Sequence, residues 1–486
     1  MRLGDLMRRA GLSGLPEDGA VAGLTADSRA VAPGMVFAAL PGARADGRAF
    51  IADAVDRGAA AVIAPEGTDW PPGVPVRPMI TSPDPRRTLA LMAAAFHGAQ
   101  PRSVVAVTGT NGKTSTVDFL RQIWIAGGER AASLGTLGLR AEGFPPGPSL
   151  TTPDPVALHA MLAALARAGF GAAAMEASSH GLDQRRLDGV VLAAAGFTNL
   201  TRDHLDYHGT MAAYRAAKLR LFDTLLPAGA TDAACTEMDA ETLAALRATA
   251  RARRFRLLTV GEAGEALRLV SARPLPDGQA LEVEAFGTRH AFHLPLPGRF
   301  QADNALLAAA LAIGAGHPAD RAIAALPGLA GVRGRMERAA VLPNGAAVYV
   351  DYAHTPDALV RLLAALRPHT AGRLHVLFGA GGDRDPGKRP LMGRAAAEGA
   401  DRVWITDDNP RSEDPATIRA AVLAGAPGAV DAGARADAIA AALSDLGPGD
   451  VLAVAGKGHE SGQEIAGTVH PFDDAATVRR LAGLAP

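Results

Sequence analysis

The chain has 486 residues, which at roughly 150 residues per domain is enough for about three domains. Hydrophobic residues make up 48% of it, so a disordered chain is excluded, and a net charge of -1 supplies neither a basic field for nucleic acid nor a polybasic segment for a membrane. Its one cysteine, Cys235, excludes an internal disulfide framework and a multi-cysteine metal site.

The first segment, residues 1–97, predicts a small α/β domain. Short apolar stretches at 35–40 and 59–64 are separated by Pro/Gly turns. The N-terminus lacks the unbroken apolar core of a signal peptide, and no run is long enough to span a membrane, so we expect a cytoplasmic protein without membrane insertion. Residues 97–101 are typical of a linker, with Pro101 ending the helix before it.

The second segment, residues 98–333, predicts a mainly parallel sheet. An apolar strand at 103–108 leads through a glycine-bearing turn into a helix at 113–126. Helix and strand signals then alternate, which is the pattern of parallel strands with crossover helices. The further expected elements are helices at 157–168, 212–226 and 303–314 and a strand at 171–176. Residues 257–296 are more β-like and predict a side sheet.

The third segment, residues 334–486, predicts a second, doubly wound sheet. Strands are expected at 347–351, 374–379, 402–406 and 451–455, and helices at 356–366, at 415–423 and in a stretch that ends near 395. The predicted fold class is therefore α/β with three domains. They are a small N-terminal α/β domain, a central domain with a mainly parallel sheet and a C-terminal Rossmann-like domain.

The segment Thr108-Gly109-Thr110-Asn111-Gly112-Lys113-Thr114-Ser115 has the composition of a phosphate-binding loop. A strand enters a glycine-bearing turn and a helix opens at once, so backbone N–H groups and the helix dipole converge on phosphate oxygens. Lys113 would supply charge to the terminal phosphates, and Thr114 a hydroxyl for Mg²⁺. Val107 stands where a strict Walker A sequence has its first glycine, and a plain strand–helix turn is the alternative.

Two further polar clusters follow strands in the second segment. Residues 175–181 end a strand where open α/β sheets bind ligands, although Glu176 alone is as easily a cap. Residues 198–208 place several His and Asp residues directly after an apolar strand, a spacing that suits the binding of Mg²⁺ or phosphate. For His208, a purely structural role is the alternative. Lys218 lies on an alanine- and leucine-rich helix, where a solvated lysine is the ordinary interpretation.

Three polar loops end strands of the third segment, at 379–388, 407–411 and 456–460. Because the carboxyl ends of strands share one crevice in a doubly wound sheet, these loops should meet. Their side chains would suit a zwitterionic amino acid, with arginine for carboxylate and glutamate for ammonium. The candidate residues are Arg384, Asn409, Arg411 and Glu460. The alternative for Asp-Asn-Pro-Arg is a turn before the next helix.

Taken together, these motifs resemble the Mur ligases over essentially the whole chain. The matching segments are 108–115, 176–180, 198–208, 351–357 and 408–411, the last similar to a diaminopimelate-recognition motif that lysine-adding relatives lack. The resemblance implies three domains, a UDP-binding one at 1–97, an ATP-binding one at 98–333 and an amino-acid-binding one at 334–486. It implies an ATP- and Mg²⁺-dependent acid–amino-acid ligase, acting as a monomer in peptidoglycan precursor synthesis and thereby in cell shape and division. The implied substrates are UDP-N-acetylmuramoyl-L-alanyl-D-glutamate and meso-2,6-diaminopimelate, joined through an acyl phosphate.

The resemblance also assigns roles to residues that match the family's motifs. The nucleotide set is Gly109, Thr110, Asn111, Gly112, Lys113, Thr114, Ser115, Asn304, Arg335 and Asp351. The UDP-muramoyl-dipeptide set is Ser28, Thr151, Thr152, Ser178, Gln184 and Arg186, and the diaminopimelate set is Arg384, Asp408, Asn409, Pro410, Arg411, Gly456 and Glu460. Mg²⁺ would be held by Thr114, Glu176, His204 and a carbamylated Lys218, and the catalytic residues would be Lys113, Glu176, His204 and Lys218. Leu150 departs from relatives that carry a polar substrate contact there.

Two other functions are compatible with parts of the pattern. One is a related ligase, either a lysine-adding Mur ligase or a folylpolyglutamate synthase, and the Asp-Asn-Pro-Arg sequence speaks against both. The other is a P-loop NTPase that binds partners and acts as a conformational switch. The amino-acid loops of the third segment speak against it. ADP release that requires both a muramoyl-dipeptide and an amino acid would separate these alternatives.

Overall fold

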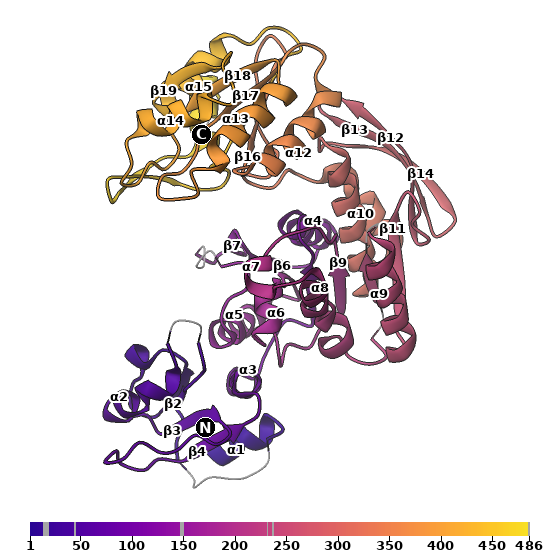
Figure 1. Ribbon diagram of the computed structural model, residues 1–486. Coiled ribbons are helices and arrows are strands. Elements are labelled where there is room, and N and C mark those ends of the chain that lie inside the picture. Colours follow the sequence, from indigo (N-terminus) through magenta and orange to yellow (C-terminus); the bar gives the residue numbers. More distant parts are fainter. Residues whose placement is uncertain (13–18, 43–44, 146–149, 231, 236–237, 485–486) are drawn as a thin grey trace. The chain divides into compact units, whose positions relative to one another are not determined.

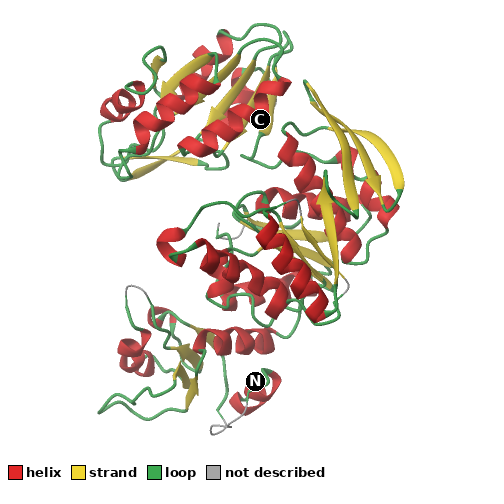
Figure 2. Ribbon diagram, turned by 45° about the vertical axis from the view of Figure 1, so that its right-hand side comes forward, coloured by secondary structure: helices red, strands yellow, loops and turns green. Residues whose placement is uncertain are grey.

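The apolar runs of the sequence form strands and helices that are grouped in two units. The computed structural model describes all residues except 13–18, 43–44, 146–149, 231, 236–237 and 485–486. One unit comprises Met1–Ala266 and Leu306–Ala325, and the other Leu267–Ala305 and Leu326–Pro486. Strands and helices alternate in both units (Figures 1 and 2), which confirms the α/β prediction.

The first unit begins with a four-stranded parallel sheet in the order β1-β2-β3-β4. The strands are β1 (Gly23–Thr25), β2 (Met35–Ala38), β3 (Ala61–Pro65) and β4 (Met79–Ser82), and the helices are α1 (Leu3–Arg9), α2 (Ile51–Asp56) and α3 (Pro85–His97). The predicted apolar stretches thus form β2 and β3. The prediction that Pro101 ends the helix before it is wrong, because Gly98 ends α3 in the left-handed conformation, with φ 70°.

A larger sheet follows, in which β11-β10-β9-β5-β8-β6-β7 are neighbours in that order. Its strands are β5 (Ser103–Thr108), β6 (Ala131–Gly135), β7 (Gly138–Arg140), β8 (Ala172–Glu176), β9 (Ala194–Phe197), β10 (Asp232–Cys235) and β11 (Arg256–Gly261). All neighbouring pairs given a register are parallel except β6 and β7. The buried runs of β5 and β8 are what a sheet covered on both faces requires.

The helices of this sheet are α4 (Lys113–Ala126), α5 (Pro155–Arg167), α6 (Ser179–Asp183), α7 (Leu205–His208), α8 (Met211–Arg220), α9 (Ala240–Arg253) and α11 (Ala319–Ala324). Strand β5 and helix α4 have the predicted bounds. The helix predicted at 212–226 is confirmed, with its last part, Leu221–Leu225, formed as a π-helix that buries Leu221 and Phe222. Helix α10 (Arg299–Gly314) contributes its part from Leu306 onward to this unit.

The second unit contains the predicted side sheet and the predicted doubly wound sheet. The side sheet is antiparallel and consists of β12 (Leu267–Leu275), β13 (Gly278–Ala285) and β14 (Thr288–Leu294). The second sheet has the order β15-β16-β20-β17-β18-β19 and is parallel apart from β15. Its strands are β15 (Glu337–Val341), β16 (Ala347–Asp351), β17 (Leu374–Phe378), β18 (Arg402–Thr406), β19 (Val430–Gly433) and β20 (Val451–Ala455).

Helices cover both faces of this C-terminal sheet. Residues of α12 (Pro356–Leu366), α13 (Lys388–Gly399) and α14 (Pro415–Leu423) share one buried apolar cluster with the strands. Residues of α15 (Arg435–Ser444) and α16 (Asp474–Leu481) share the other. A separate hairpin, β21 (Gly462–Ile465) and β22 (Thr468–Pro471), follows β20.

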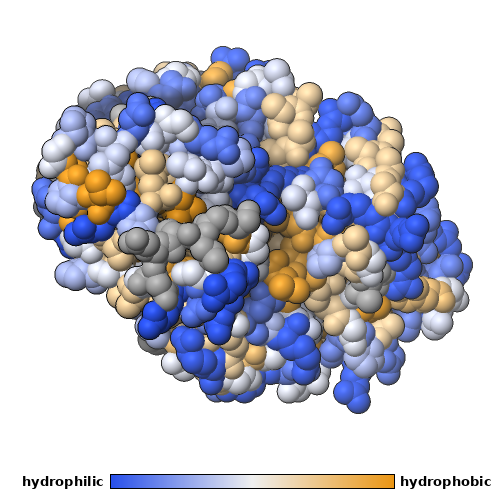
Figure 3. Space-filling model, turned by 90° about the horizontal axis from the view of Figure 1, so that it is seen from below, coloured by the Kyte–Doolittle hydropathy of each residue, from blue (hydrophilic) through white to orange (hydrophobic). Residues whose placement is uncertain are grey.

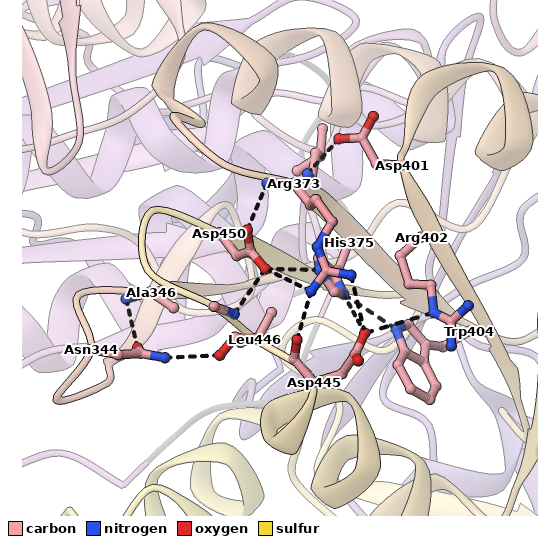
Figure 4. Close-up of polar contacts among 12 residues, drawn as sticks. Asn344, Ala346, Arg373, His375, Asp401, Arg402, Trp404, Asp445, Leu446 and Asp450 are labelled. Carbon is pink, nitrogen blue, oxygen red and sulfur yellow. Dashed lines mark hydrogen bonds and ion pairs between the residues drawn. The ribbon is translucent and has the colours of Figure 1, made fainter.

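A charged cluster lies at the amino ends of the central strands of the C-terminal sheet (Figure 4). His375 is fully buried, and its Nε2 lies 3.2 Å from Asp450 Oδ2. Asp450 also accepts hydrogen bonds from the backbone N–H of Arg373 at 2.6 Å and of Gly447 at 2.9 Å. Burial alone would raise the pKa of Asp450, but these hydrogen bonds outweigh burial and lower that pKa. The pKa of His375 is lowered by burial.

Hydrophilic residues dominate the face of the molecule seen in Figure 3, with hydrophobic residues in a few groups between them. The most exposed large hydrophobic side chains are Val76, 78% exposed, and Val469, 67% exposed. Among the described residues, none of the helices has both the length and the apolar character that a membrane span requires.

Candidate functional site

The predicted phosphate-binding loop joins β5 to α4 in the first unit and is held by the segment after β9. Thr110 N donates to Asn199 O at 2.8 Å, and Asn111 N donates to Asn199 Oδ1 at 3.0 Å. Gly109 has φ 141°, and a Cβ at this position would lie 1.8 Å from Thr198 Oγ1. Glycine is therefore required here by both conformation and space, and the two motifs of the sequence form one structure.

Lys113 and Thr114 open helix α4 at this loop. The Lys113 ammonium donates to Gly109 O at 3.0 Å and to Thr110 O at 2.9 Å, so it lies over the loop rather than in solvent. Gly112 precedes the helix with φ 82°, and Ser115 is buried in the first turn. The arrangement can bind an anion, because the ammonium and the helix N-terminus are at one place.

Glu176 lies buried at the carboxyl end of β8, next to the loop. Its Oε1 accepts hydrogen bonds from Thr114 Oγ1 at 3.0 Å and from Thr136 N at 2.8 Å. A Cβ on Gly135 would lie 2.1 Å from the same oxygen, so Glu176 packs directly on the end of β6. A hydroxyl and a carboxylate oxygen this close are the hard donors that Mg²⁺ prefers, and Thr114 and Glu176 thus fit the predicted metal site. The sequence did not single out Thr136.

The residues predicted to hold the muramoyl-dipeptide form a hydrogen-bonded network beside Glu176. Thr152 Oγ1 contacts Ser178 Oγ at 3.0 Å and Glu176 O at 3.0 Å. Arg186 donates from Nη1 to Thr152 O at 2.6 Å and from Nη2 to Gln184 Oε1 at 2.7 Å. Thr151 Oγ1 lies 3.1 Å from Thr136 Oγ1, which brings it into the same group. Burial lowers the pKa of the Arg186 guanidinium.

Lys218 is buried, not solvated, on helix α8. Its Nζ donates to Gly109 O at 2.7 Å and lies 4.4 Å from the centroid of the Tyr214 ring. Burial, and then the charge of Lys113, lower the pKa of Lys218 well below its usual range. A neutral amine is the form that reacts with CO₂, and the resulting carbamate would present two oxygens beside the phosphate-binding loop. The ordinary interpretation of Lys218 as a solvated lysine is therefore wrong, and the surroundings fit the predicted modification.

Three histidines and two tyrosines gather beside this part of the site. His180 lies 5.0 Å from His204 and 4.1 Å from Tyr207 between ring centroids, and His208 lies 5.2 Å from Tyr214. Burial lowers the pKa of His180 and of His208. Burial raises the pKa of Tyr214 to about 12.

His204, a predicted metal ligand, has a half-exposed side chain and the left-handed backbone φ of 52°. It approaches Lys218 only through Tyr214, which both contact, and among the described residues no hydrogen bond joins the two. Imidazole nitrogen is also a donor that Mg²⁺ uses less readily than oxygen. His204 thus fits the predicted metal set less directly than Thr114, Glu176 and a carbamylated Lys218.

The remaining predicted nucleotide and UDP residues lie elsewhere in the chain. Ser28 begins a short 3-10 turn (Ser28–Ala30) after β1, where Asp27 and Arg29 form an exposed ion pair. Asn304, Arg335 and Asp351 belong to the second unit. Asp351 accepts hydrogen bonds from Met336 N and Ala353 N, each at 2.8 Å, and burial raises its pKa. Their contribution to a nucleotide site stays a prediction.

In the second unit, the loops after β18 and β20 meet, as predicted. Asn409 Nδ2 donates to Glu460 Oε2 at 3.0 Å, while Asn409 Oδ1 accepts from Lys457 Nζ at 3.0 Å. Lys457 is fully buried and also lies 3.3 Å from Glu460 Oε2 and 3.7 Å from Asp408 Oδ1. Gly456 has φ 112°, and a Cβ there would lie 2.8 Å from Asp408 Oδ2. Lys457 was not predicted as a site residue, although the sequence Gly-Lys-Gly-His-Glu contains it.

Arg411 and Arg384 differ in how firmly they are held. Arg411, behind the buried Pro410, donates from Nη1 to Gly382 O at 2.7 Å and from Nε to Glu464 Oε2 at 3.1 Å. Arg384 is exposed and donates to Asp383 O at 3.3 Å. The loop therefore fixes one arginine and leaves the other at the surface, and Glu464 is a second residue that the sequence did not indicate.

The chain matches three family profiles in order. They are the Mur ligase family catalytic domain at 20–97, the Mur ligase middle domain at 107–312, and the Mur ligase glutamate ligase domain at 334–458. Relatives named UDP-N-acetylmuramoyl-L-alanyl-D-glutamate--2,6-diaminopimelate ligase include proteins from Caulobacter vibrioides and Chelativorans. They are 55% and 53% identical to this chain, and each alignment covers 99% of both partners.

Solved structures show the same similarity. A structure of a UDP-N-acetylmuramoyl-L-alanyl-D-glutamate--2,6-diaminopimelate ligase is 32% identical, with a TM-score of 0.75 over 99% of each chain. A folylpolyglutamate synthase from Mycobacterium tuberculosis, 21% identical, has a TM-score of 0.62 over 82% of this chain and 95% of its own. The likeness to the synthase shows the fold alone.

Proposed function

This chain belongs to the Mur ligase family, and we propose that it adds meso-2,6-diaminopimelate to UDP-N-acetylmuramoyl-L-alanyl-D-glutamate with the hydrolysis of ATP. As a member of this family it is an ATP-dependent amide-forming ligase of peptidoglycan precursor synthesis. The observation that carries the substrate assignment is the cluster of loops at one edge of the C-terminal sheet, where Asn409 donates to Glu460 and the guanidinium of Arg411, two residues further on, donates to Gly382 O. A guanidinium and a carboxylate at one place complement an amino acid that carries both charges.

The chemistry requires activation of a carboxylate, which is a poor electrophile. An oxygen of the glutamate side-chain carboxylate attacks the γ-phosphorus of ATP, ADP leaves, and an acyl phosphate forms. The amine of diaminopimelate then attacks the acyl carbon, the bond to phosphate breaks, and the amine loses a proton. Lys113 and the backbone N–H groups of the loop would hold the phosphates in line, and such placement lowers a barrier by about 7–11 kcal/mol in well-oriented cases.

Mg²⁺ would be held by Thr114 and Glu176 at one position and by carbamylated Lys218 and His204 at a second. When bound, Mg²⁺ neutralises charge on the transferring phosphoryl oxygens. The carbamate forms when the neutral Lys218 amine attacks CO₂ and releases a proton, which converts a positive side chain into an oxygen ligand of opposite charge. Support for this proposal comes from the burial of Lys218 and from its contact with Gly109 O in the phosphate-binding loop.

The other substrates have candidate sites in the first unit. The network of Thr151, Thr152, Ser178, Gln184 and Arg186 would hold the muramoyl-dipeptide, since its glutamate must lie beside the phosphate-binding loop. Ser28, in the N-terminal sheet, would contact the uridine diphosphate end. We assign the three domains to residues 1–97, 98–333 and 334–486. We further propose a monomer in the cytoplasm, with its product required for cell division.

The test is the substrate dependence of ADP release by the purified chain. ADP should appear only when ATP, UDP-muramoyl-dipeptide and diaminopimelate are all present, and the product should be the UDP-muramoyl-tripeptide by mass. ADP release without the dipeptide would overturn the proposal in favour of a switching NTPase. Equal use of lysine and diaminopimelate would overturn the assignment of the amino-acid substrate.

A further inference from the structure

The hairpin β21–β22 supports the loop that carries Arg411. It lies beyond residue 458, where the matched family profile ends. Gln463 Nε2 donates to Asp408 O at 2.6 Å, and Glu464 N donates to Asn409 Oδ1 at 3.0 Å. Strand β21 therefore forms hydrogen bonds with Asp408 and Asn409, in the loop that carries Arg411, which lie more than fifty positions earlier in the sequence.

Arg411 depends on this support because its backbone is in a left-handed conformation, with φ 53°. Such a φ is unfavourable for a residue with a long side chain and persists where the surroundings fix it. Both backbone polar groups of Arg411 bond to the hairpin, with its N donating to Glu464 O at 3.1 Å and its O accepting from Ala466 N at 2.7 Å. The hairpin thus sets the direction in which the Arg411 side chain leaves the loop.

The side chain of Glu464 holds the guanidinium as well. Glu464 Oε2 accepts from Arg411 Nε at 3.1 Å, and Gly382 O accepts from Arg411 Nη1 at 2.7 Å. Arg411 Nη2 donates to no residue in the described part of the chain. Two of the three guanidinium nitrogens are therefore fixed, and the third is left for a ligand carboxylate.

We propose that Glu464 is a positioning residue that determines specificity for an amino acid with a second carboxylate. This inference rests on the proposed function, in which Arg411 binds the distal carboxylate of diaminopimelate. A guanidinium that is already oriented loses less side-chain freedom when a carboxylate binds to it. The orientation of Arg411 therefore strengthens the binding of diaminopimelate alone. Lysine has no carboxylate at that end, and its binding does not draw on the orientation of Arg411.

The experiment compares Glu464→Ala and Glu464→Gln with wild type and with His470→Ala, an exposed change on the same hairpin. We expect Glu464→Ala to raise the KM for diaminopimelate about tenfold, with kcat at saturation and the efficiency with lysine nearly unchanged. Glu464→Gln keeps an oxygen that accepts from Nε and should retain most of the selectivity. Direct titration of diaminopimelate into each protein supplies the same comparison without turnover, and thermal unfolding reports folding.

Selectivity unchanged in Glu464→Ala would overturn the inference while leaving the proposed function intact. A lower KM in both Glu464 variants would also overturn it, because Glu464 would then compete with the substrate for Arg411. If Glu464→Ala does not fold, Glu464→Asp, which withdraws the carboxylate from Nε, carries the same expectation. A wild type that uses lysine and diaminopimelate equally would overturn both this inference and the substrate assignment.

Discussion

The two ends of the C-terminal sheet carry buried charges of similar kinds in different arrangements. At the amino ends, Asp450 is bonded to the Arg373 backbone, to Gly447 and to His375, so the carboxylate is saturated by its own domain (Figure 4). At the carboxyl ends, buried Lys457 fixes Asn409 and Glu460 in loops that reach the surface. The type of residue does not separate the two clusters, but their place in the sheet does.

The difference indicates what each cluster is for. Strand ends in an open α/β sheet bind ligands on the carboxyl side, where loops are free to vary without breaking the sheet. A cluster whose charges pair with one another at the amino ends contributes to stability. We therefore expect variants at carboxyl ends to lose activity and variants at amino ends to lose stability.

The largest effect should come from Lys218 of the first unit, which lies on helix α8 and contacts Gly109 O in the loop at the carboxyl end of β5. Lys218→Ala removes the carbamate that would hold Mg²⁺, and we expect kcat to fall by about 100- to 1000-fold with the fold retained. Short carboxylic acids added to the assay should restore part of the activity by occupying the vacated space. A Lys218→Ala protein with full activity would contradict the carbamate and weaken the distinction between the two ends.

The amino-end counterpart is Asp450→Ala. It leaves the backbone N–H groups of Arg373 and Gly447 without this partner in a partly buried place, so the free energy of unfolding should fall by about 2 kcal/mol. Denaturant titration measures this change. The KM for diaminopimelate should stay at the wild-type value below the melting temperature, and a selective rise in that KM would break the comparison.

Gly135→Ala should have an intermediate effect on activity. The new Cβ would lie 2.1 Å from Glu176 Oε1, so the carboxylate must leave its place beside Thr114. We expect kcat to fall about 10- to 100-fold, as the displacement of a group near the chemistry does. Gly428→Ala is the matched control, because a Cβ at that exposed turn has nothing within 4 Å. Equal activity of the two variants would show that Glu176 does not need its present position.

The smallest effect concerns pH and His375. Its folded pKa is lowered, so the unfolded chain binds a proton more readily, and the stability that neutral His375 contributes is present above its unfolded pKa of about 6.5. That contribution is lost as the pH falls toward the folded pKa. Between pH 7 and 5 the free energy of unfolding should decrease more in wild type than in His375→Gln. Parallel pH profiles of the two proteins would contradict this assignment.

The sequence predicted elements best where a short buried run defines them. Strands β5, β16, β18 and β20 and helices α4, α12 and α14 have the predicted bounds, because each is an apolar run between turn residues or caps. The hairpin β21–β22 was not predicted, since its residues are mostly exposed and its partner is Arg411, not a neighbouring apolar strand. Its position depends on tertiary contacts that a local pattern does not contain.

The same reason explains which site residues were found. Motifs of adjacent residues, such as the phosphate-binding loop and Asp-Asn-Pro-Arg, were visible in the sequence. Lys457 and Glu464 were not, because their role comes from contacts with Asn409 and Arg411 that lie 48 and 53 positions away. Lys218 was found only through the family resemblance, because its position on the helix is typical of a solvated lysine. Its burial is visible only in the tertiary structure.

The most direct test is the ratio of kcat/KM for diaminopimelate to kcat/KM for lysine, measured by ADP release in wild type and Arg411→Ala. Loss of one partner of a buried charged pair costs about 2–5 kcal/mol, so wild type should prefer diaminopimelate by tens- to thousands-fold. Arg411→Ala should lose most of this preference through KM for diaminopimelate, with the KM values for ATP and the muramoyl-dipeptide nearly unchanged. Comparable use of both amino acids by wild type, or an unchanged ratio in Arg411→Ala, would contradict the account.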